Sequence, residues 1–350
     1  MKKTIICAAA LSMIAGLAQA QSNVTVYGLI DANLTYNSDA NAAKESQFKL
    51  NSGGMNTSRF GLRASEDLGG GLKAIMQLEG GILLDTGASD GDLFGRQANV
   101  GLQGDFGKLI AGRSYSTTYD FILPFDPMAY APQYSWATTG GATGARKDGM
   151  LTSASNLLKY QFDGKGYKLG ATYAFGESAG DTTSNAKMAL AGSVNFGAFA
   201  AVLAYDQVNS AAIASGAIDK AKSIHLAGSY QIGDVKLFAG LRDYQKSLAS
   251  GAKELQSNTL WTGVSYKLTP AWNLTGAYYY QDIKNLAAGA DADPGMLVGR
   301  AKYALSKRTD IYIAAAFAKG SNGKAVGVSR DDAGFGTGQN SATVGIQHRF

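Results

Sequence analysis

The sequence predicts an all-β protein, a transmembrane 16-stranded antiparallel β-barrel. Runs of about ten residues with alternating apolar and polar side chains fill the chain from Val24 to Phe350. The connections between these runs alternate between one tight turn and one long polar spacer. Strands with one apolar and one polar face can cross lipid only as a closed cylinder, in which every backbone hydrogen-bonding group is satisfied.

Residues 1–20 have the pattern of a cleaved secretory signal peptide. Lys2 and Lys3 precede a mostly apolar stretch, Thr4–Leu17, and Ala18-Gln19-Ala20 supplies small residues at the cleavage positions. A membrane anchor is the alternative, but the apolar run is short and no stop-transfer pattern follows. We therefore expect one barrel domain over residues 21–350.

The composition of the mature chain excludes several classes of function. Its only cysteine, Cys7, lies in the signal segment, which excludes disulfides, thiol catalysis and cysteine-ligated metals. Without Lys2 and Lys3 the chain has 30 basic and 27 acidic residues, and a net charge of +3 does not indicate nucleic acid as a partner. We find no linker-like change of composition that would divide the chain into two soluble domains.

Seven tight turns punctuate the sequence. Glycine, aspartate, asparagine and proline occur there because hairpin turns need a positive or preset φ. The turns are Glu66–Gly71, Gly104–Gly107, Asp163–Gly166, Asn195–Ala198, Ile232–Asp234, Leu268–Ala271 and Leu305–Arg308.

Eight longer polar spacers lie between the turns. They cover roughly residues 38–55, 85–93, 114–153, 178–185, 209–221, 247–256, 284–295 and 320–340. Seven turns and eight spacers connect sixteen strands, and an even number of strands places both termini on the side of the short turns.

The strands alternate as a barrel requires. In the first strand, Val24, Val26 and Leu34 share one face, whereas Thr25 and Asp31 share the other. A soluble sandwich would have the same period, but in a sixteen-stranded barrel the polar face lines a water-filled lumen. By this strand count Lys73 and Lys159 face the lumen.

Several motifs together resemble the trimeric general porins of the Gram-negative outer membrane, in particular those of beta-proteobacteria. The motifs are Val24–Gly28, Ser58–Arg63, Glu66–Ala74, Phe94–Leu102, Phe106–Arg113, Leu305–Thr309 and Gly345–Phe350. The resemblance covers essentially the whole mature chain. It implies a homotrimer in the outer membrane with periplasmic termini, surrounded by lipid and lipopolysaccharide. It further implies that Phe350 is the assembly signal read by the outer-membrane barrel insertion machinery.

The spacer over residues 114–153 is far longer than an ordinary hairpin connection. In porins the corresponding third loop folds into the barrel and constricts the channel. Aromatic and aliphatic residues, among them Tyr115, Phe121, Tyr134 and Trp136, give this segment apolar surface to bury. A surface flap or an adhesive loop is the alternative to an inward fold.

The resemblance also indicates which charges line the constriction. Fixed charges across a narrow aqueous gap select ions because screening there is incomplete. The basic wall would comprise Arg59, Arg63 and Arg113 by resemblance and Lys73 and Lys159 by parity. Asp120 and Asp126 are the acidic candidates on the loop. For each of these residues, the alternative is a solvated charge without a role in selectivity.

Three departures from the family's pattern weaken the expected anion selectivity. Leu29 and Gln97 replace basic residues of related porins, and Leu123–Pro127 replaces the usual acidic loop motif. We expect at most a weak anion preference.

We expect no enzyme activity, metal or cofactor. His225 and His348 are the only histidines, and by parity neither has an evident nucleophile or carboxylate partner. The glycine-rich stretches lie at turns between strands, so none opens a helix as a phosphate cradle does.

The function predicted from the sequence is passive diffusion of small hydrophilic solutes and ions through an outer-membrane channel. An outer-membrane barrel that acts as an adhesin or as a ligand-specific binding protein is the alternative from another class. Stepwise ohmic conductance in a planar bilayer would distinguish the two.

Overall fold

The computed structural model describes residues 23–138, 149–285, 287, 289–330 and 334–350, and it forms one closed antiparallel sheet. The predicted signal peptide lies outside the described residues. Within these ranges no helix is both long and apolar enough to cross a membrane.

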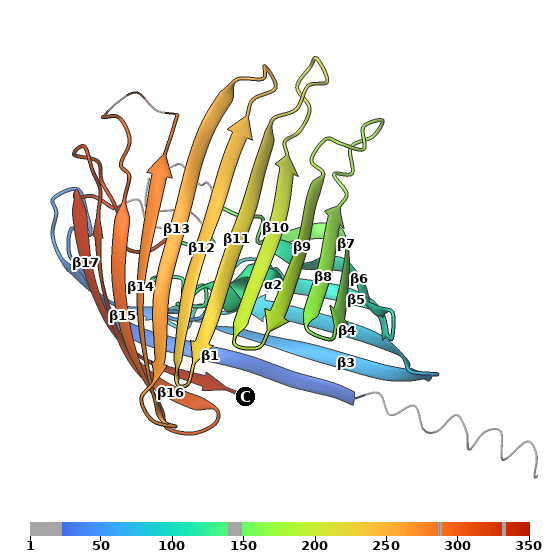
Figure 1. The fold of residues 1–350 in the computed structure, drawn as a ribbon, viewed down its shortest axis with the longest axis horizontal. Coiled ribbons are helices and arrows are strands. Elements are labelled where there is room, and N and C mark those ends of the chain that lie inside the picture. The colour runs from blue at the N-terminus through green and yellow to red at the C-terminus, as the bar shows by residue number, and fades with distance from the viewer. Residues whose placement is uncertain (1–22, 139–148, 286, 288, 331–333) are drawn as a thin grey trace, which may run out of the picture.

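Within the described residues, seventeen strand segments make up the sheet, and two short helices follow the sixth strand (Figure 1). The elements in order are β1 (Asn23–Asn37), β2 (Gln47–Ser52), β3 (Arg59–Gly69), β4 (Leu72–Gly81), β5 (Gln97–Gly104), β6 (Gly107–Tyr115), α2 (Thr117–Ile122), η2 (Leu123–Phe125), β7 (Ser153–Gly164), β8 (Tyr167–Ala174), β9 (Lys187–Phe196), β10 (Phe199–Asn209), β11 (Lys220–Ile232), β12 (Val235–Ser247), β13 (Lys253–Lys267), β14 (Trp272–Ile283), β15 (Gly295–Ala304), β16 (Thr309–Lys319) and β17 (Gly338–Arg349).

The barrel has sixteen wall positions because β2 and β3 share one of them. β2 pairs with the second half of β1, and β3 pairs with the first half. The other edge of β1 pairs with β17, which closes the sheet. The predicted sixteen-stranded barrel is thereby confirmed.

The interruption between β2 and β3 differs from the prediction, which treated residues 38–55 as a spacer. The chain leaves the ladder at Gly53, whose φ of +81° suits glycine. The next backbone N–H groups, of Gly54, Met55 and Asn56, donate to the Asp31 carboxylate at 3.3, 3.0 and 2.8 Å. A buried acceptor therefore replaces the ladder hydrogen bonds of this stretch.

All seven predicted tight turns are confirmed. Each joins consecutive strands from β3–β4 to β15–β16, and the short turns gather at one end of the barrel while the longer connections gather at the other (Figure 1). Phe350 lies at the short-turn end, where its backbone N–H and C=O both bond to Gly28 of β1, at 3.1 and 3.0 Å.

The two faces of the sheet differ in chemistry as the alternation predicts. The outer face carries exposed apolar side chains, such as Val24 at 63 % and Leu226 at 56 % exposure. The inner face carries buried polar side chains, such as Asp31, Thr259 and Gln281. The wall is therefore apolar outside and polar inside, the reverse of a soluble globular domain.

Candidate functional site

The longest connection, residues 116–152, begins with a capped helical turn. The Ser116 hydroxyl accepts a hydrogen bond from the Tyr119 N–H at 3.1 Å and so caps α2, and Pro124 lies in the short η2 that follows. The Thr117 N–H donates to Thr172 Oγ1 of β8 at 3.0 Å, which fixes α2 against the inner face. The Ser116 N–H also donates to Thr152 O at 2.9 Å, so the start and the end of the segment lie side by side.

The same segment bonds to distant strands of the wall. Trp261 Nε1 of β13 donates to Phe125 O at 3.0 Å, and the Arg242 guanidinium of β12 donates to Ala137 O at 2.7 Å. The Tyr134 hydroxyl pairs with Ser341 Oγ of β17 at 3.1 Å. Between these anchors Ile122, Met128, Tyr134 and Trp136 are at most 1 % exposed. The expectation that apolar residues of this spacer pack together is met over its described part; residues 139–148 lie outside it.

Asp126 is an anchor at the centre of the segment. Its carboxylate accepts from the Tyr279 hydroxyl of β14, from Ser135 Oγ at 2.7 Å, and from the backbone N–H groups of Met128 and Tyr130 at 3.3 and 2.6 Å. Burial raises the pKa of the Asp126 carboxyl above its ordinary value, although these four donors act in the opposite direction. Asp126 is only 3 % exposed, so its carboxylate is buried within the packed segment instead of facing water. Its predicted role in the constriction stays a prediction.

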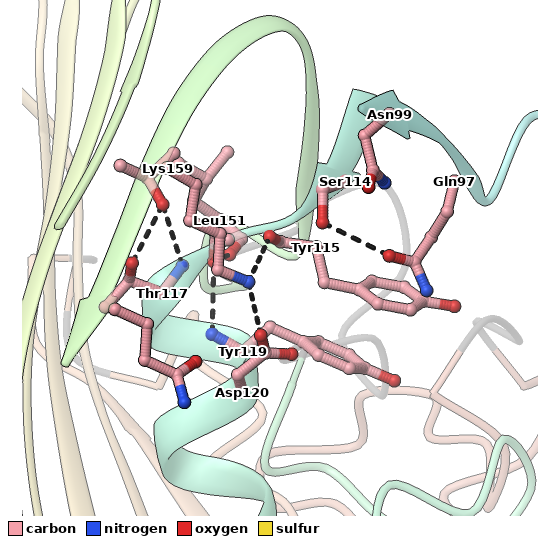
Figure 2. Close-up of polar contacts among 12 residues, drawn as sticks. Gln97, Asn99, Ser114, Tyr115, Thr117, Tyr119, Asp120, Leu151 and Lys159 are labelled. Carbon is pink, nitrogen blue, oxygen red and sulfur yellow. Dashed lines mark hydrogen bonds and ion pairs between the residues drawn. The ribbon is translucent and has the colours of Figure 1, made fainter. Parts of the chain in front are cut away.

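Two tyrosines extend the packing from the start of the segment. The rings of Tyr115 and Tyr119 stack at 4.5 Å, side by side in Figure 2, and the Tyr130 hydroxyl donates to Tyr119 O at 3.3 Å. Burial raises the pKa of Tyr119 and of Tyr130, so both hydroxyls remain protonated.

Lys159 and Asp120, predicted on opposite sides of the constriction, form an ion pair. Lys159 projects from β7 with its side chain 3 % exposed, and its ammonium contacts the Asp120 carboxylate of α2 and donates to Tyr115 O at 3.0 Å. The structure therefore brings this wall cation and this loop anion together. Their opposite charges largely cancel at a distance.

Arg59, Arg63 and Lys73 lie on the inner face, as predicted. Arg59 pairs with Leu29, and Arg63 pairs with Thr25, on the same face of β1 as Asp31. The Arg63 guanidinium lies over the Tyr27 ring at 4.0 Å. These three residues have the wall positions that a role in ion selection requires, and the role itself stays a prediction.

Arg113 departs from its predicted position. It pairs with Ala98, on the face of the exposed Val100 rather than on that of the buried Asn99. Lys108, Ile110 and Gly112 occupy the inner-facing positions of β6, so regular alternation places Arg113 on the outer-facing ones. The Arg113 guanidinium bonds to Gly95 O and to Ser155 Oγ. The register thus assigns Arg113 to the outer face.

A polar cavity of about 600 Å³ lies beside α2 on the inner face of β3–β7. Its lining includes Arg63, Lys73, Lys159 and Asp120, together with Lys108, which the sequence reasoning missed. Counting forward from the tight turn at Gly107 would have found Lys108, since it follows that turn directly on the inner-facing register.

The sequence reasoning also missed a buried ion pair next to Tyr115, which lines this cavity. Glu79 of β4 accepts from Arg96 Nε at 2.9 Å and from the Tyr27 hydroxyl at 2.8 Å, and Arg96 lies over the Tyr115 ring at 5.6 Å. Arg96 belongs to a connection and Glu79 to a strand, so no single periodicity relates them. This ion pair neutralises one positive and one negative side chain near the segment.

His225 corrects a further expectation, because it does have a carboxylate partner. Its Nε2 lies 2.9 Å from Asp206 Oδ2, and Asp206 Oδ1 accepts from the Leu151 N–H at 3.2 Å. This arrangement ties the end of the long segment to β10 and β11. His348 pairs through Nδ1 with Thr309 Oγ1 at 2.9 Å. In the described part of the chain, no three His, Cys, Asp or Glu side chains are grouped to hold a metal.

A closed transmembrane barrel with an apolar outside, a polar inside and a long packed connection is a channel-forming barrel. The chain belongs to the family of Gram-negative porins, whose family model matches residues 7–323. It is 32 % identical to an outer membrane porin protein of Bordetella pertussis over 409 aligned residues and 32 % identical to outer membrane porin protein 32 of Delftia acidovorans over 363, with full coverage of both chains in each case.

Solved structures show the same fold. An anion-selective porin from Comamonas acidovorans superposes with a TM-score of 0.80 and 29 % identity, over 94 % of this chain and 100 % of that chain. OmpT of Vibrio cholerae, at 18 % identity and a TM-score of 0.70 over 95 % of this chain and all of that one, shares the fold. The protein is therefore an outer-membrane general diffusion porin.

Proposed function

We propose that the channel passes small hydrophilic solutes and ions with a weak preference for anions, and that residues 116–138 and 149–152 narrow its interior. The observation that carries the proposal is the set of inner-face contacts on opposite walls. The segment leaves β6 and returns to β7, yet Trp261 of β13 and Tyr279 of β14 bond to its centre. β7 to β12 separate these attachment points along one side of the barrel.

The proposed sign of selectivity follows from which charges remain unpaired. In the part of the chain that the structure describes, Arg63, Lys73 and Lys108 have no acidic side chain within ion-pair distance. Asp120 pairs with Lys159, and Asp126 is buried among donors. One inner-face carboxylate, Asp67, lies opposite Lys73 on β3, so the three cations still outnumber it along this stretch of wall. Incomplete screening in a narrow gap then favours anions. The solved porin at 29 % identity is described as anion-selective, which agrees with this sign.

We further propose that the protein is a homotrimer, as the family resemblance implies, and that it carries out no catalysis. Its outer apolar face would contact lipid and lipopolysaccharide. Phe350, which pairs with Gly28 at the barrel seam, would serve as the signal for the insertion machinery. An oligomer that resists detergent in a gel without heating tests the trimer.

Planar-bilayer recording of the purified full-length barrel tests the channel and its selectivity. We expect stepwise ohmic openings, and a reversal potential in a KCl gradient displaced modestly to the anion side. Replacing Arg59 with glutamine should shift this potential toward cations, whereas replacing the exposed Arg308 of the last tight turn should not. Folded oligomers without conductance would favour the adhesin or ligand-binding alternative, and a cation-side reversal potential would refute the proposed sign.

A further inference from the structure

The cavity beside α2 has an ordered pattern of charge that selectivity for simple ions does not require. Strand pairing arranges its inner-face residues in three parallel rows. The arginine row is Arg63, Gln77 and Asn99, and the apolar row is Ser65, Ile75, Gly101 and Ile110, followed by Lys159. The lysine row is Asp67, Lys73, Gln103, Lys108 and Gln161, of which Asp67 does not line the cavity. Nearly all of these side chains line the cavity of about 600 Å³.

The two cationic rows lie on either side of the apolar row. Arg63 and Lys73 belong to rows four residues apart along the strands, a separation of about 13 Å between Cα positions. Lys73 and Lys108 flank Gln103 on adjacent strands, roughly 10 Å apart. Positive charge is therefore collected at two ends of the cavity rather than at one point.

The floor between these two ends is apolar. Ile75 and Ile110 line it, and Gly101 between them presents no side chain. A Cβ at Gly101 would lie 2.1 Å from Leu109 O, so glycine is required there and the depression is built into the wall. Hydrocarbon rather than a hydrated ion suits such a floor.

The cations at both ends are available to a ligand. Lys159, the fourth basic residue of the lining, is already paired with Asp120, which closes the cavity on the α2 side. Arg63 rests on the Tyr27 ring at 4.0 Å, which holds the guanidinium in place without neutralising it. Gln97 accepts from Ser114 through Oε1 at 3.2 Å, so its amide N–H groups remain as neutral donors (Figure 2).

We infer that this cavity binds elongated dicarboxylates, one carboxylate at Arg63 and the other at the Lys73–Lys108 pair, with the methylene chain over Ile75, Gly101 and Ile110. The inference rests on the proposed anion-passing channel and narrows its solute class. A compact dianion cannot reach both ends, and a monocarboxylate leaves one end uncompensated. The wall thus recognises both the two terminal charges of the ligand and the hydrocarbon between them.

The test uses full-length protein in planar bilayers at constant ionic strength. Adipate, succinate, suberate, hexanoate and sulfate are added in turn to chloride solutions, and the reduction of the chloride current is measured. We expect saturable reduction by adipate, weaker reduction by succinate, and little by hexanoate or sulfate. Sulfate acting as strongly as adipate would show a single charge cluster and overturn the inference.

Matched variants locate the site. Lys108→Gln and Arg63→Gln should each raise the adipate concentration for half reduction by roughly tenfold. Lys168→Gln removes the same charge from the inner face, but Lys168 lines a neighbouring cavity on the other side of α2, so adipate reduction should persist. Equal loss in all three variants would indicate a general field effect and overturn the site.

Different results would overturn the dicarboxylate site and the channel. Ohmic chloride conductance without saturable adipate reduction would overturn the dicarboxylate site and leave the channel intact. Absence of conductance from folded protein would overturn the channel itself. Tryptophan fluorescence of the same samples confirms folding, since Trp136 and Trp261 are buried in the packed segment and its anchor.

Discussion

The ammonium of Lys159 on β7 contacts the carboxylate of Asp120 on α2, joining the barrel wall to the first turn of its longest connection. The lysine is 3 % exposed and the aspartate 36 %, so the pair lies at the edge of the water-filled interior. Removing the aspartate leaves a cation that cannot be hydrated fully, whereas removing the lysine leaves an anion that can.

Asp120→Asn should therefore move the reversal potential in a salt gradient further to the anion side. A unit charge at 4 Å in water is worth about 1 kcal/mol, so the anion-to-cation permeability ratio should rise by up to about fivefold. Lys159→Gln should move the potential the other way. Asp181→Asn, in an exposed connection, serves as the control and should change neither. Shifts of the same sign in both partners would contradict the pairing.

Asp126→Ala should release the long segment from the wall without unfolding the barrel. Four donors lose their acceptor, and an unsatisfied buried donor costs about 1–3 kcal/mol. The mature chain lacks cysteine, so a Thr138→Cys reporter, at a site that is 1 % exposed, can be labelled specifically. We expect labelling to accelerate by roughly tenfold or more. Asp181→Ala, which removes an exposed carboxylate of the same charge, is the control. Equal labelling rates in the two variants would refute the role of Asp126 as an anchor.

Periodicity predicted the wall well because its rules are local. The tight turns followed from their glycine, aspartate, asparagine and proline residues, and the faces of Lys73 and Lys159 followed from two-residue alternation, which continues wherever the ladder is regular. The resemblance, not the alternation, placed Arg113 on the basic wall. Lys108, Ile110 and Gly112 face inward, so the regular register of β5 and β6 puts Arg113 on the outer face.

The pairings inside the barrel could not be predicted in the same way. Glu79 with Arg96, and Asp206 with His225, join residues whose neighbourhood depends on how connections and strands close in space. The break between β2 and β3 depends on the Asp31 carboxylate, a buried acceptor that alternation marks only as polar. The resemblance suggested that the long segment carries acidic charge. Only the packing of the segment shows that the Asp126 carboxylate is buried and anchors the segment to β14.

Tyr312→Phe should lower the stability of the barrel. The Tyr312 hydroxyl of β16 donates to Asp31 Oδ1 at 2.6 Å, and Gln347 of β17 donates to Oδ2 at 3.1 Å, so Asp31 ties the closing strands to the β2–β3 interruption. Loss of one hydrogen bond to a charged acceptor should reduce the free energy of unfolding by about 1.5–3 kcal/mol, measured by urea titration in vesicles. Tyr278→Phe, on the exposed outer face, is the matched control. An equal loss of unfolding free energy in Tyr278→Phe would show that the hydrogen bond from Tyr312 to Asp31 does not account for the effect.

Stability should also depend on pH through Asp126. Burial raises the pKa of this carboxyl above the ordinary 3.8, so the folded protein binds a proton more readily than the unfolded chain. Its contribution is therefore fully present below the ordinary pKa and is lost as the pH rises through the raised pKa. The difference in unfolding free energy between wild type and Asp126→Asn should fall as the pH rises from 3.8. A difference that grows with pH would contradict the direction of the shift.

Gly28→Leu should impair closure of the barrel. A Cβ at Gly28 would lie 2.3 Å from the Phe350 ring and 2.8 Å from Arg59 O, so the last residue could not keep its two backbone hydrogen bonds to β1. The fraction that folds in lipid, measured by heat-modifiable migration in a gel, should drop sharply. Gly192→Leu is the matched control, because an added Cβ there meets nothing nearer than 3.5 Å. If Gly28→Leu folds as completely as Gly192→Leu, the contact between β1 and the terminal phenylalanine is not needed to close the sheet.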